Sequence, residues 1–173
     1  MRIVSVLEDK NFEKRIAITP EIANKYISIG IDVSLPEGYG YHLGFNDEEY
    51  EKIGVDLVKD EQNLFDKADI FVQLTLPSDN KLSNLKQNQS LIGVLNPYSN
   101  KQKLENLVKK KINNFTLELL PRITRAQSMD ILSSQANLAG YKAVVDSFAY
   151  FEKAIPMMMT AAGTVPAAKV LVI

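Results

Sequence analysis

Short β-branched runs alternate with helix-like segments along the first two thirds of the sequence, and this alternation constrains the fold more than any other feature. Apolar runs typical of strands occupy residues 2–7, 31–35, 55–58, 70–74, 91–95 and 115–119. Segments with helical spacing of apolar residues lie between them, at residues 20–29, 46–53, 61–67 and 101–111. Such alternation is typical of a parallel sheet covered by helices. The sequence therefore predicts an α/β fold with a flavodoxin- or Rossmann-like parallel sheet.

The last third of the sequence predicts a different organisation. A long helix is expected from Ser128 to about Phe151, with small residues at three- and four-residue spacing that would let another backbone approach closely. Residues 154–168 form an uncharged stretch interrupted by prolines, too short to span a membrane and expected to be a buried connection. The apolar run 169–173 is typical of a buried parallel strand, which needs neighbours on both sides.

These features predict three regions. Residues 1–127 form an N-terminal α/β domain, residues 128–152 a connector helix, and residues 153–173 a linker with the first strand of a truncated second domain.

Composition excludes several classes of function. The chain has no cysteine and one histidine, which removes disulfides, thiol nucleophiles and multi-histidine metal sites. Lysine and arginine total 20 against 21 acidic residues, so no broad basic field is present to bind nucleic acid. The charged segment that follows the first strand does not resemble a signal peptide, and a cytoplasmic location is expected.

Four residues near the N-terminus have both a functional and a structural interpretation. His42, Tyr39 and Tyr41 lie in a glycine-rich loop, where a structural role is favoured over acid–base work or ring stacking. Arg15 precedes a helix start expected at Pro20, where a guanidinium and backbone N–H groups together suit a small carboxylate. By residue type alone, a surface arginine is the favoured interpretation of Arg15.

The strongest local feature is the loop 121–130, which follows the last strand of the set. It offers the guanidinium of Arg122, the amide of Gln127 and the carboxylate of Asp130 as orienting groups. Ligands of open α/β sheets bind outside the carboxyl ends of the strands, where this loop must lie. A helix N-terminus capped by Ser128 would explain the serine and Asp130, but neither Arg122 nor Gln127.

The common nucleotide-binding and hydrolase motifs GxGxxG, GxxxxGK[ST] and GxSxG do not occur in the sequence. A complete nucleotide-binding site is therefore not expected within these 173 residues.

Four segments resemble the N-terminal part of the alpha subunit of proton-translocating NAD(P) transhydrogenase, a family related to alanine dehydrogenase. They are EKRIAITPE at 13–21, RITRAQSMD at 122–130, LSSQANLAGYKAV at 132–144 and PMMMTAAGTVPAAKVLV at 156–172. In that family the last strand leads into the glycine-rich turn of an NAD-binding Rossmann domain. The resemblance implies that Gln127 and Ser133 hydrogen-bond the nicotinamide carboxamide, while Arg122 and Asp130 fix the position of the ring.

The alanine dehydrogenase branch needs a carboxylate-binding arginine, a lysine and a histidine. Arg15 matches the carboxylate-binding arginine. The lysine-bearing segment of the alanine dehydrogenase branch corresponds in this sequence to QLTLP at 73–77, which has no lysine, and no histidine follows the strand at 91–95. Hydride transfer between two nicotinamides needs alignment and exclusion of water rather than a proton-transfer group. The missing residues therefore favour a transhydrogenase.

The resemblance implies a fragment of the NAD(H)-binding component, which passes hydride from NADH to NADP+ with coupled proton translocation and is inactive alone. NADP and the membrane span would belong to partner components, the complete protein would form a homodimer, and its location would be cytoplasmic and peripheral to the inner membrane. Two alternatives stay open, namely a non-catalytic assembly or regulatory module and an alanine dehydrogenase-like enzyme. Downstream sequence containing a glycine-rich turn would separate the first alternative from the enzyme.

Overall fold

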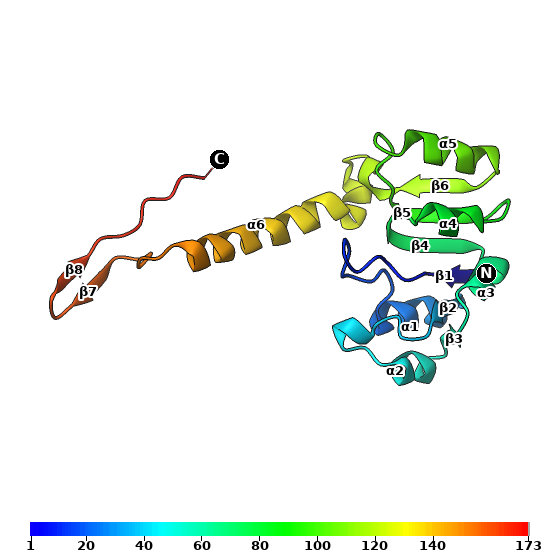
Figure 1. The fold of residues 1–173 in the computed structure, drawn as a ribbon, viewed down its shortest axis with the longest axis horizontal. Coiled ribbons are helices and arrows are strands. Elements are labelled where there is room, and N and C mark those ends of the chain that lie inside the picture. Colours follow the sequence, from blue (N-terminus) through cyan, green and yellow to red (C-terminus); the bar gives the residue numbers. More distant parts are fainter. Residues whose placement is uncertain (173) are drawn as a thin grey trace. The chain divides into compact units, whose positions relative to one another are not determined.

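The computed structural model describes residues 1–172 and divides them into two compact units (Figure 1). The first unit contains Met1–Met129, and the second begins at Asp130.

A six-stranded parallel sheet forms the centre of the first unit. Its strand order is β3-β2-β1-β4-β5-β6, the doubly wound order of a Rossmann fold, which confirms the predicted fold class. The strands are β1 (Arg2–Val4), β2 (Asp32–Pro36), β3 (Asp56–Val58), β4 (Ile70–Thr75), β5 (Ser90–Val94) and β6 (Asn113–Thr116).

Five α-helices connect these strands, and their ends follow local capping signals. They are α1 (Pro20–Ser28), α2 (Asp47–Lys52), α3 (Gln62–Lys67), α4 (Asp79–Ser83) and α5 (Lys101–Lys109). Thr19 caps α1 through its side chain, and Asn46 forms a capping box with Glu49 at α2. Gly30 and Gly54 follow α1 and α2 at φ values of 81° and 91°, the left-handed conformation that glycine adopts without strain.

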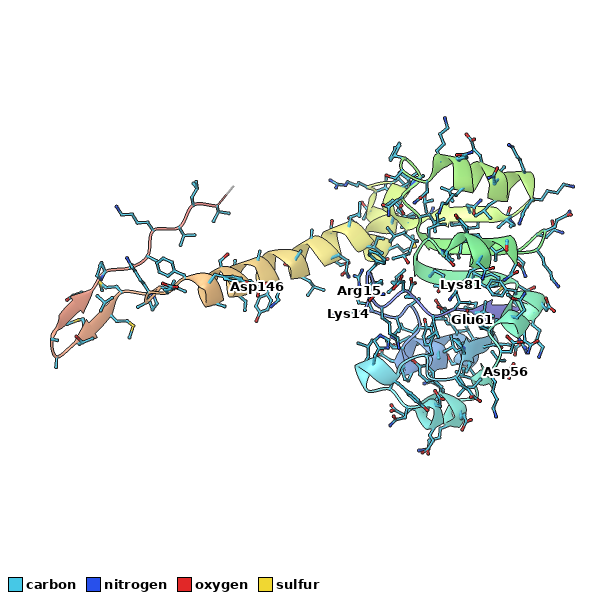
Figure 2. The ribbon with its side chains drawn as sticks, viewed as in Figure 1. Lys14, Arg15, Asp56, Glu61, Lys81 and Asp146 are labelled. Atoms are coloured by element: carbon cyan, nitrogen blue, oxygen red, sulfur yellow. The ribbon has the colours of Figure 1, made fainter. Side chains whose placement is uncertain are left out.

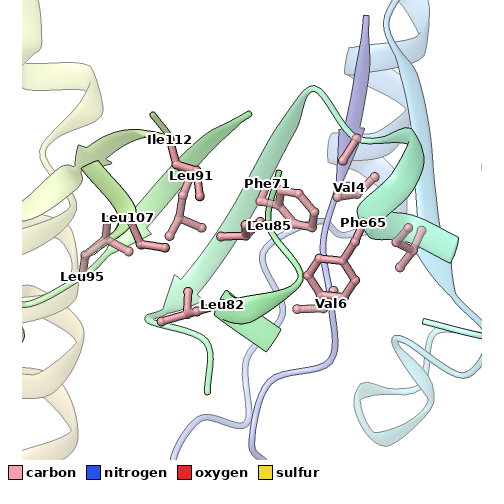
Figure 3. Close-up of a cluster of buried hydrophobic side chains, with 12 residues drawn as sticks. Val4, Val6, Phe65, Phe71, Leu82, Leu85, Leu91, Leu95, Leu107 and Ile112 are labelled. Atoms are coloured by element: carbon pink, nitrogen blue, oxygen red, sulfur yellow. The ribbon is translucent and has the colours of Figure 1, made fainter. Parts of the chain in front are cut away.

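Two apolar clusters cover opposite faces of the sheet because successive strand residues point to opposite sides. One cluster packs α3, α4 and α5 against β1, β4 and β5, and includes Phe65, Phe71, Leu82, Leu91 and Leu107 (Figure 3). The other packs α1 and α2 against β1, β2 and the start of β4, through residues such as Ala23, Val33 and Tyr50. Helices therefore cover both sides, but not the same strands on each side.

Helix α4 and strand β6 differ from the expected elements, and β1 ends at Val4 rather than at residue 7. Helix α4 is absent from the prediction, because it is short and polar and because Pro77 marks only the end of the preceding strand. Strand β6 occupies Asn113–Thr116 rather than 115–119, and Leu117–Leu119 forms a 3-10 turn (η2). Because β6 begins with two asparagines, its start does not appear as an apolar run in the sequence.

The second unit contains a helix and a hairpin. Helix α6 spans Ile131–Tyr150, and strands β7 (Met158–Thr160) and β8 (Gly163–Val165) pair antiparallel. The expected buried connection at 154–168 is wrong, because Met158 and Met159 are 47% and 84% exposed. Among the described residues, no helix is long and apolar enough to cross a membrane.

The strand expected at 169–173 is not formed over residues 169–172, while Ile173 lies outside the described residues. A β-strand needs a hydrogen-bonded neighbour, and no described segment pairs with residues 169–172. The assignment of this segment to a second domain, like the division of the chain into three regions, stays a prediction.

Candidate functional site

The carboxyl ends of β1 and β4 form the topological switch point of the sheet. The two strands are neighbours, but the chain continues from β1 to β2 on one side and from β4 to β5 on the other. Open α/β sheets hold ligands in the crevice at such a point. A cavity of about 270 Å³ lies here, lined by Leu7, Glu8, Asp9, Gln73, Thr75, Leu76, Pro77, Ser78 and Lys81.

Glu8 ties the two strand ends together at this cavity. Its Oε1 accepts hydrogen bonds from the backbone N–H groups of Leu74 at 2.7 Å and Thr75 at 3.3 Å. Its Oε2 accepts one from the Thr75 hydroxyl at 2.5 Å. The carboxylate thus satisfies the end of β4 from the loop after β1.

Lys81 and Glu61 hold the same loop from the other side. Lys81 Nζ donates to Glu61 Oε1 and to the Leu7 carbonyl, both at 2.8 Å, and Glu61 Oε1 accepts from Leu7 N at 2.9 Å (Figure 2). The Lys81 and Glu61 side chains are only 23% and 28% exposed. This ammonium group holds two oxygen acceptors and fixes the rim of the cavity.

A buried polar chain runs from β4 to the segment before α1. Gln73 Oε1 accepts from Ser5 Oγ at 2.5 Å, and Ser5 Oγ accepts from the Tyr39 hydroxyl at 2.7 Å. The Tyr39 oxygen accepts from Ala17 N at 3.1 Å and Ile18 N at 3.4 Å. Burial raises the pKa of Tyr39 to about 12. These contacts confirm the structural interpretation of Tyr39.

The glycine-rich loop around Tyr39 anchors its surroundings through further contacts. The Nε2 atom of His42 lies 2.7 Å from the Lys14 carbonyl, so this nitrogen carries the donated proton. The Tyr41 hydroxyl donates to Asp47 Oδ2 at 3.0 Å. A Cβ atom at Gly40 would lie 2.7 Å from Phe45 Cβ, which explains the glycine. The His42 contact is consistent with a structural role, while Tyr41 is 56% exposed, so a structural role for these two residues stays a prediction.

Arg15 is paired with Glu13 two residues earlier. Its Nε and Nη2 atoms donate to the two carboxylate oxygens at 2.8 and 2.6 Å, a bidentate geometry. The Arg15 hydrogen bond lowers the pKa of the Glu13 carboxyl, and the Glu13 hydrogen bond raises the pKa of Arg15. The two N–H donors of Arg15 that would suit a small carboxylate ligand are therefore already bonded to the Glu13 carboxylate.

The carboxyl end of β5 is held by a carboxylate from beyond β6. Glu118 accepts hydrogen bonds from Leu95 N at 3.3 Å and Asn96 N at 2.5 Å. Asn96 has a φ of 47°, in the left-handed region that asparagine tolerates better than most residues. An amide side chain thus follows the carboxyl end of β5.

The predicted loop 121–130 spans the boundary between the two units. Arg122 and Gln127 are exposed in the first unit, beside and within a 3-10 helix (η3) at Thr124–Met129. Ala126 is 5% exposed and anchors this helix. Among residues 1–172, neither the Arg122 nor the Gln127 side chain has a hydrogen bond to another residue. Both side chains present their polar groups to solvent.

Asp130 and Ser133 lie together at the start of α6 in the second unit. Asp130 caps the helix by accepting from Leu132 N and Ser133 N, both at 3.0 Å, and its Oδ2 accepts from the Ser133 hydroxyl at 2.6 Å. The predicted cap at Ser128 is wrong, because residues 124–129 form η3 and the helix starts at Ile131. Asp130 takes the cap because its carboxylate reaches both free N–H groups.

The structure thus brings Asp130 and Ser133 together, while the convergence of these two residues with Arg122 and Gln127 stays a prediction. Sequence reasoning missed the switch-point cavity and its polar residues Glu8 and Thr75. The only available signal was their position after two buried strands. That signal becomes useful only when the order of the strands in the sheet is known.

A family model for the N-terminal domain of alanine dehydrogenase/PNT matches residues 5–139. The chain is 41% identical over 177 residues to an NAD(P) transhydrogenase alpha subunit of Rickettsia prowazekii, covering 100% of this chain and 46% of that protein. It is 27% identical over 146 residues to the alanine dehydrogenase of Methanococcus maripaludis, covering 84% of this chain and 39% of that protein.

A solved structure of a transhydrogenase from Sinorhizobium meliloti superposes with a TM-score of 0.86 at 41% identity, over 96% of this chain and 50% of that one. A solved L-alanine dehydrogenase shares the fold, with a TM-score of 0.64 at 21% identity over 68% of this chain and 32% of that one. The chain spans about half the length of these transhydrogenase relatives.

Proposed function

This chain belongs to the alanine dehydrogenase/PNT family through its N-terminal domain, and from that premise we propose that it forms the N-terminal part of the NAD(H)-binding component of a transhydrogenase. Its role there is to support hydride transfer from NADH to NADP+, coupled to proton translocation by membrane-spanning partners. The observation that carries the proposal is the 41% identity over the whole chain to a transhydrogenase alpha subunit, against 27% to an alanine dehydrogenase.

The polar groups at the carboxyl edge support this choice between the two branches. Thr75, Gln73 and Asn96 stand where the dehydrogenase branch would place proton-transfer groups, and Lys81 is held by Glu61 and the Leu7 carbonyl. Reductive amination of a keto acid requires proton transfers as well as hydride transfer. Hydride exchange between two nicotinamides requires close approach and alignment only.

The exposed donors of loop 121–130 fit a nicotinamide group. The Gln127 amide offers both a donor and an acceptor for a carboxamide, and Arg122 offers several N–H donors on a planar group. Bound NADH supplies the hydride. Gln127 and Ser133 would hydrogen-bond the carboxamide, while Arg122 and Asp130 would fix the orientation of the ring. In the complete protein, which we expect to be a homodimer peripheral to the inner membrane, these residues would exclude water and limit movement of the ring.

The proposal is tested with membranes from cells that express this chain together with the remaining transhydrogenase components. NADH-dependent reduction of an NADP+ analogue should require the chain and should fall to background when its gene is deleted. The same preparation, supplied with pyruvate and ammonium, should show no oxidation of NADH above background. Pyruvate-dependent oxidation that is lost in Arg15→Ala would contradict the transhydrogenase assignment and favour the dehydrogenase branch.

A further inference from the structure

The connection between β5 and β6 continues beyond the end of their backbone pairing. The last register partners of the two strands are Gly93 and Thr116. Just beyond this pair, the Glu118 carboxylate accepts hydrogen bonds from Leu95 N at 3.3 Å through Oε2 and from Asn96 N at 2.5 Å through Oε1. Each carboxylate oxygen therefore holds one N–H group, and the side chain stands in for the next backbone pair of the ladder.

The turn that Glu118 holds is fixed by contacts of its own. The Leu95 side chain is fully buried, and its carbonyl accepts from Asn100 Nδ2 at 2.9 Å. The Asn96 carbonyl accepts from Ser99 N at 3.0 Å and from Asn100 N at 2.9 Å. The carboxylate thus connects the chain after β6 to a well-anchored part of the sheet rather than to another exposed loop.

The chain that follows Glu118 has few other anchors. Within the described structure, none of residues 119–125 is buried, and the next buried side chain is that of Ala126. The backbone hydrogen bonds of this stretch join residues two or three positions apart, so they shape the loop without tying it to the sheet. The position of Arg122 therefore depends on Glu118 before it and Ala126 after it, whereas Gln127 directly follows its own anchor.

We propose that Glu118 is a positioning residue for hydride transfer, because it holds the segment from which Arg122 would orient the nicotinamide ring. The inference rests on the proposed function and extends it to a residue outside loop 121–130. Glu118 acts through Arg122 and needs no contact of its own with the cofactor. A displacement of ~1 Å at the reacting groups can cost ~100-fold in rate, so a loosened segment should slow the transfer.

Replacement of Glu118 by glutamine is the informative change. Glutamine has the same shape, but it has only one acceptor oxygen, and its NH2 group would face the second backbone N–H. Glu49→Gln is the matched control, because one Glu49 oxygen accepts from Asn46 N at 3.0 Å in the capping box of α2. A glutamine can keep that single bond.

The first test measures the clamp and the segment without any cofactor. In the chain carrying Glu118→Gln, the Leu95 and Asn96 N–H groups should exchange with solvent at least about fivefold faster than in the parent, because local opening becomes easier. Trypsin should also cleave after Arg122 at least about fivefold faster, since proteolysis follows the population of the open form. Both rates should change by less than about twofold in Glu49→Gln.

The second test uses the complete transhydrogenase and asks whether Glu118 acts through Arg122. Glu118→Gln should slow single-turnover hydride transfer at least about tenfold, with NADH affinity within about threefold of the parent. In an Arg122→Ala background the same change should slow transfer by less than about twofold, because the group that it positions is gone. In a Gln127→Asn background the two effects should multiply, as expected for residues that act independently.

Several outcomes would overturn the proposal. Unchanged transfer in Glu118→Gln, or the same slowing with and without the Arg122 side chain, would leave Glu118 with a structural role only. If Glu118→Gln fails to fold, hydrogen exchange of the parent decides, and Leu95 and Asn96 N–H groups that exchange as fast as those of residues 122–125 would refute the clamp. A parent enzyme that transfers no hydride would overturn the proposed function itself, whereas an active parent with an indifferent Glu118→Gln overturns this inference alone.

Discussion

The Tyr39 hydroxyl donates to Ser5 Oγ at 2.7 Å while accepting from two successive backbone N–H groups, those of Ala17 and Ile18. One phenol thus joins the end of β1 to the segment that leads from Arg15 into α1. The glycine-rich loop fixes that segment by this contact and by the His42 contact with the Lys14 carbonyl.

Replacing Tyr39 with Phe should destabilise the chain by about 1–3 kcal/mol, because the buried Ile18 N–H, the part-buried Ala17 N–H and the Ser5 hydroxyl lose a partner. Urea unfolding followed by circular dichroism measures the change. Tyr41→Phe is the matched control, since its hydroxyl bonds Asp47 at an exposed position and its loss should cost less than about 0.5 kcal/mol. Equal effects of the two substitutions would show that the buried chain of hydrogen bonds contributes little.

The raised pKa of Tyr39, about 12, makes stability depend on pH in alkaline solution. An unfolded tyrosine ionises near ~10, so the folded chain binds more protons above that pH. The stability due to this phenol should be complete below about pH 10 and should fall as the pH rises toward 12. Burial also raises the pKa of Tyr50, so tyrosinate absorbance should show one late-titrating phenol fewer in Tyr39→Phe than in the parent. The same number in both proteins would contradict the buried assignment of Tyr39.

In the complete enzyme, Arg122→Ala, Gln127→Asn and Asp130→Asn should slow hydride transfer far more than they weaken NADH binding. A misplacement of ~1 Å at the reacting carbon costs up to ~100-fold in rate, whereas most binding energy would come from the distant end of the cofactor. Asn is as good an N-cap as Asp, so Asp130→Asn should leave the stability of α6 nearly unchanged.

Single-turnover transfer, NADH affinity and thermal unfolding separate these effects. Arg125→Ala removes another exposed guanidinium from the same loop and is the control. A mispositioned ring costs up to ~100-fold in the rate of hydride transfer. If all three variants transfer hydride within about twofold of the parent rate, the loop has only a structural role as a helix cap.

The 173-residue chain alone should bind NADH weakly or not at all. The pyrophosphate and ribose contacts of a Rossmann site come from a glycine-rich turn, and the sequence contains no GxGxxG. Calorimetric titration with NADH is the measurement. A dissociation constant near 1 μM, or about −8 kcal/mol, would show that these residues carry most of the site.

Two glycines should respond in opposite ways to replacement by alanine. A Cβ atom at Gly93 would lie 2.4 Å from the Gln73 carbonyl oxygen, beside the register shift between β4 and β5, so Gly93→Ala should cost about 1–3 kcal/mol. Gly140 in α6 has open space at the same position, and Gly140→Ala should stabilise the helix by up to ~1 kcal/mol. Thermal unfolding of both variants decides, and a loss of stability in Gly140→Ala would point to a backbone packed against that glycine.

The sequence predicts the parallel sheet well because buried strands such as 70–74 and 91–95 are apolar on both faces. It predicts β6 poorly, since an edge strand that begins with Asn113 and Asn114 has no apolar run at its start. The start of α6 is misplaced because Ser128 and Asp130 are both good caps, and only the backbone conformation of residues 124–129 selects Asp130. The contacts of Glu8 and Tyr39 depend on strand order, which no local pattern encodes.

The central position of β1 has a consequence for synthesis of the chain on the ribosome. This strand emerges before the other strands of the sheet, and β2 pairs with it early, but its other neighbour is β4, which begins at Ile70. The ribosome adds about 5–20 residues per second, so one edge of β1 stays unpaired for several seconds before β4 is synthesised. During this interval Val4 and Val6, which become fully buried in the finished protein, have no β4 to cover them. During synthesis the strand that becomes central in the sheet therefore lacks one of its two neighbours. The sheet cannot be completed before β4 has emerged.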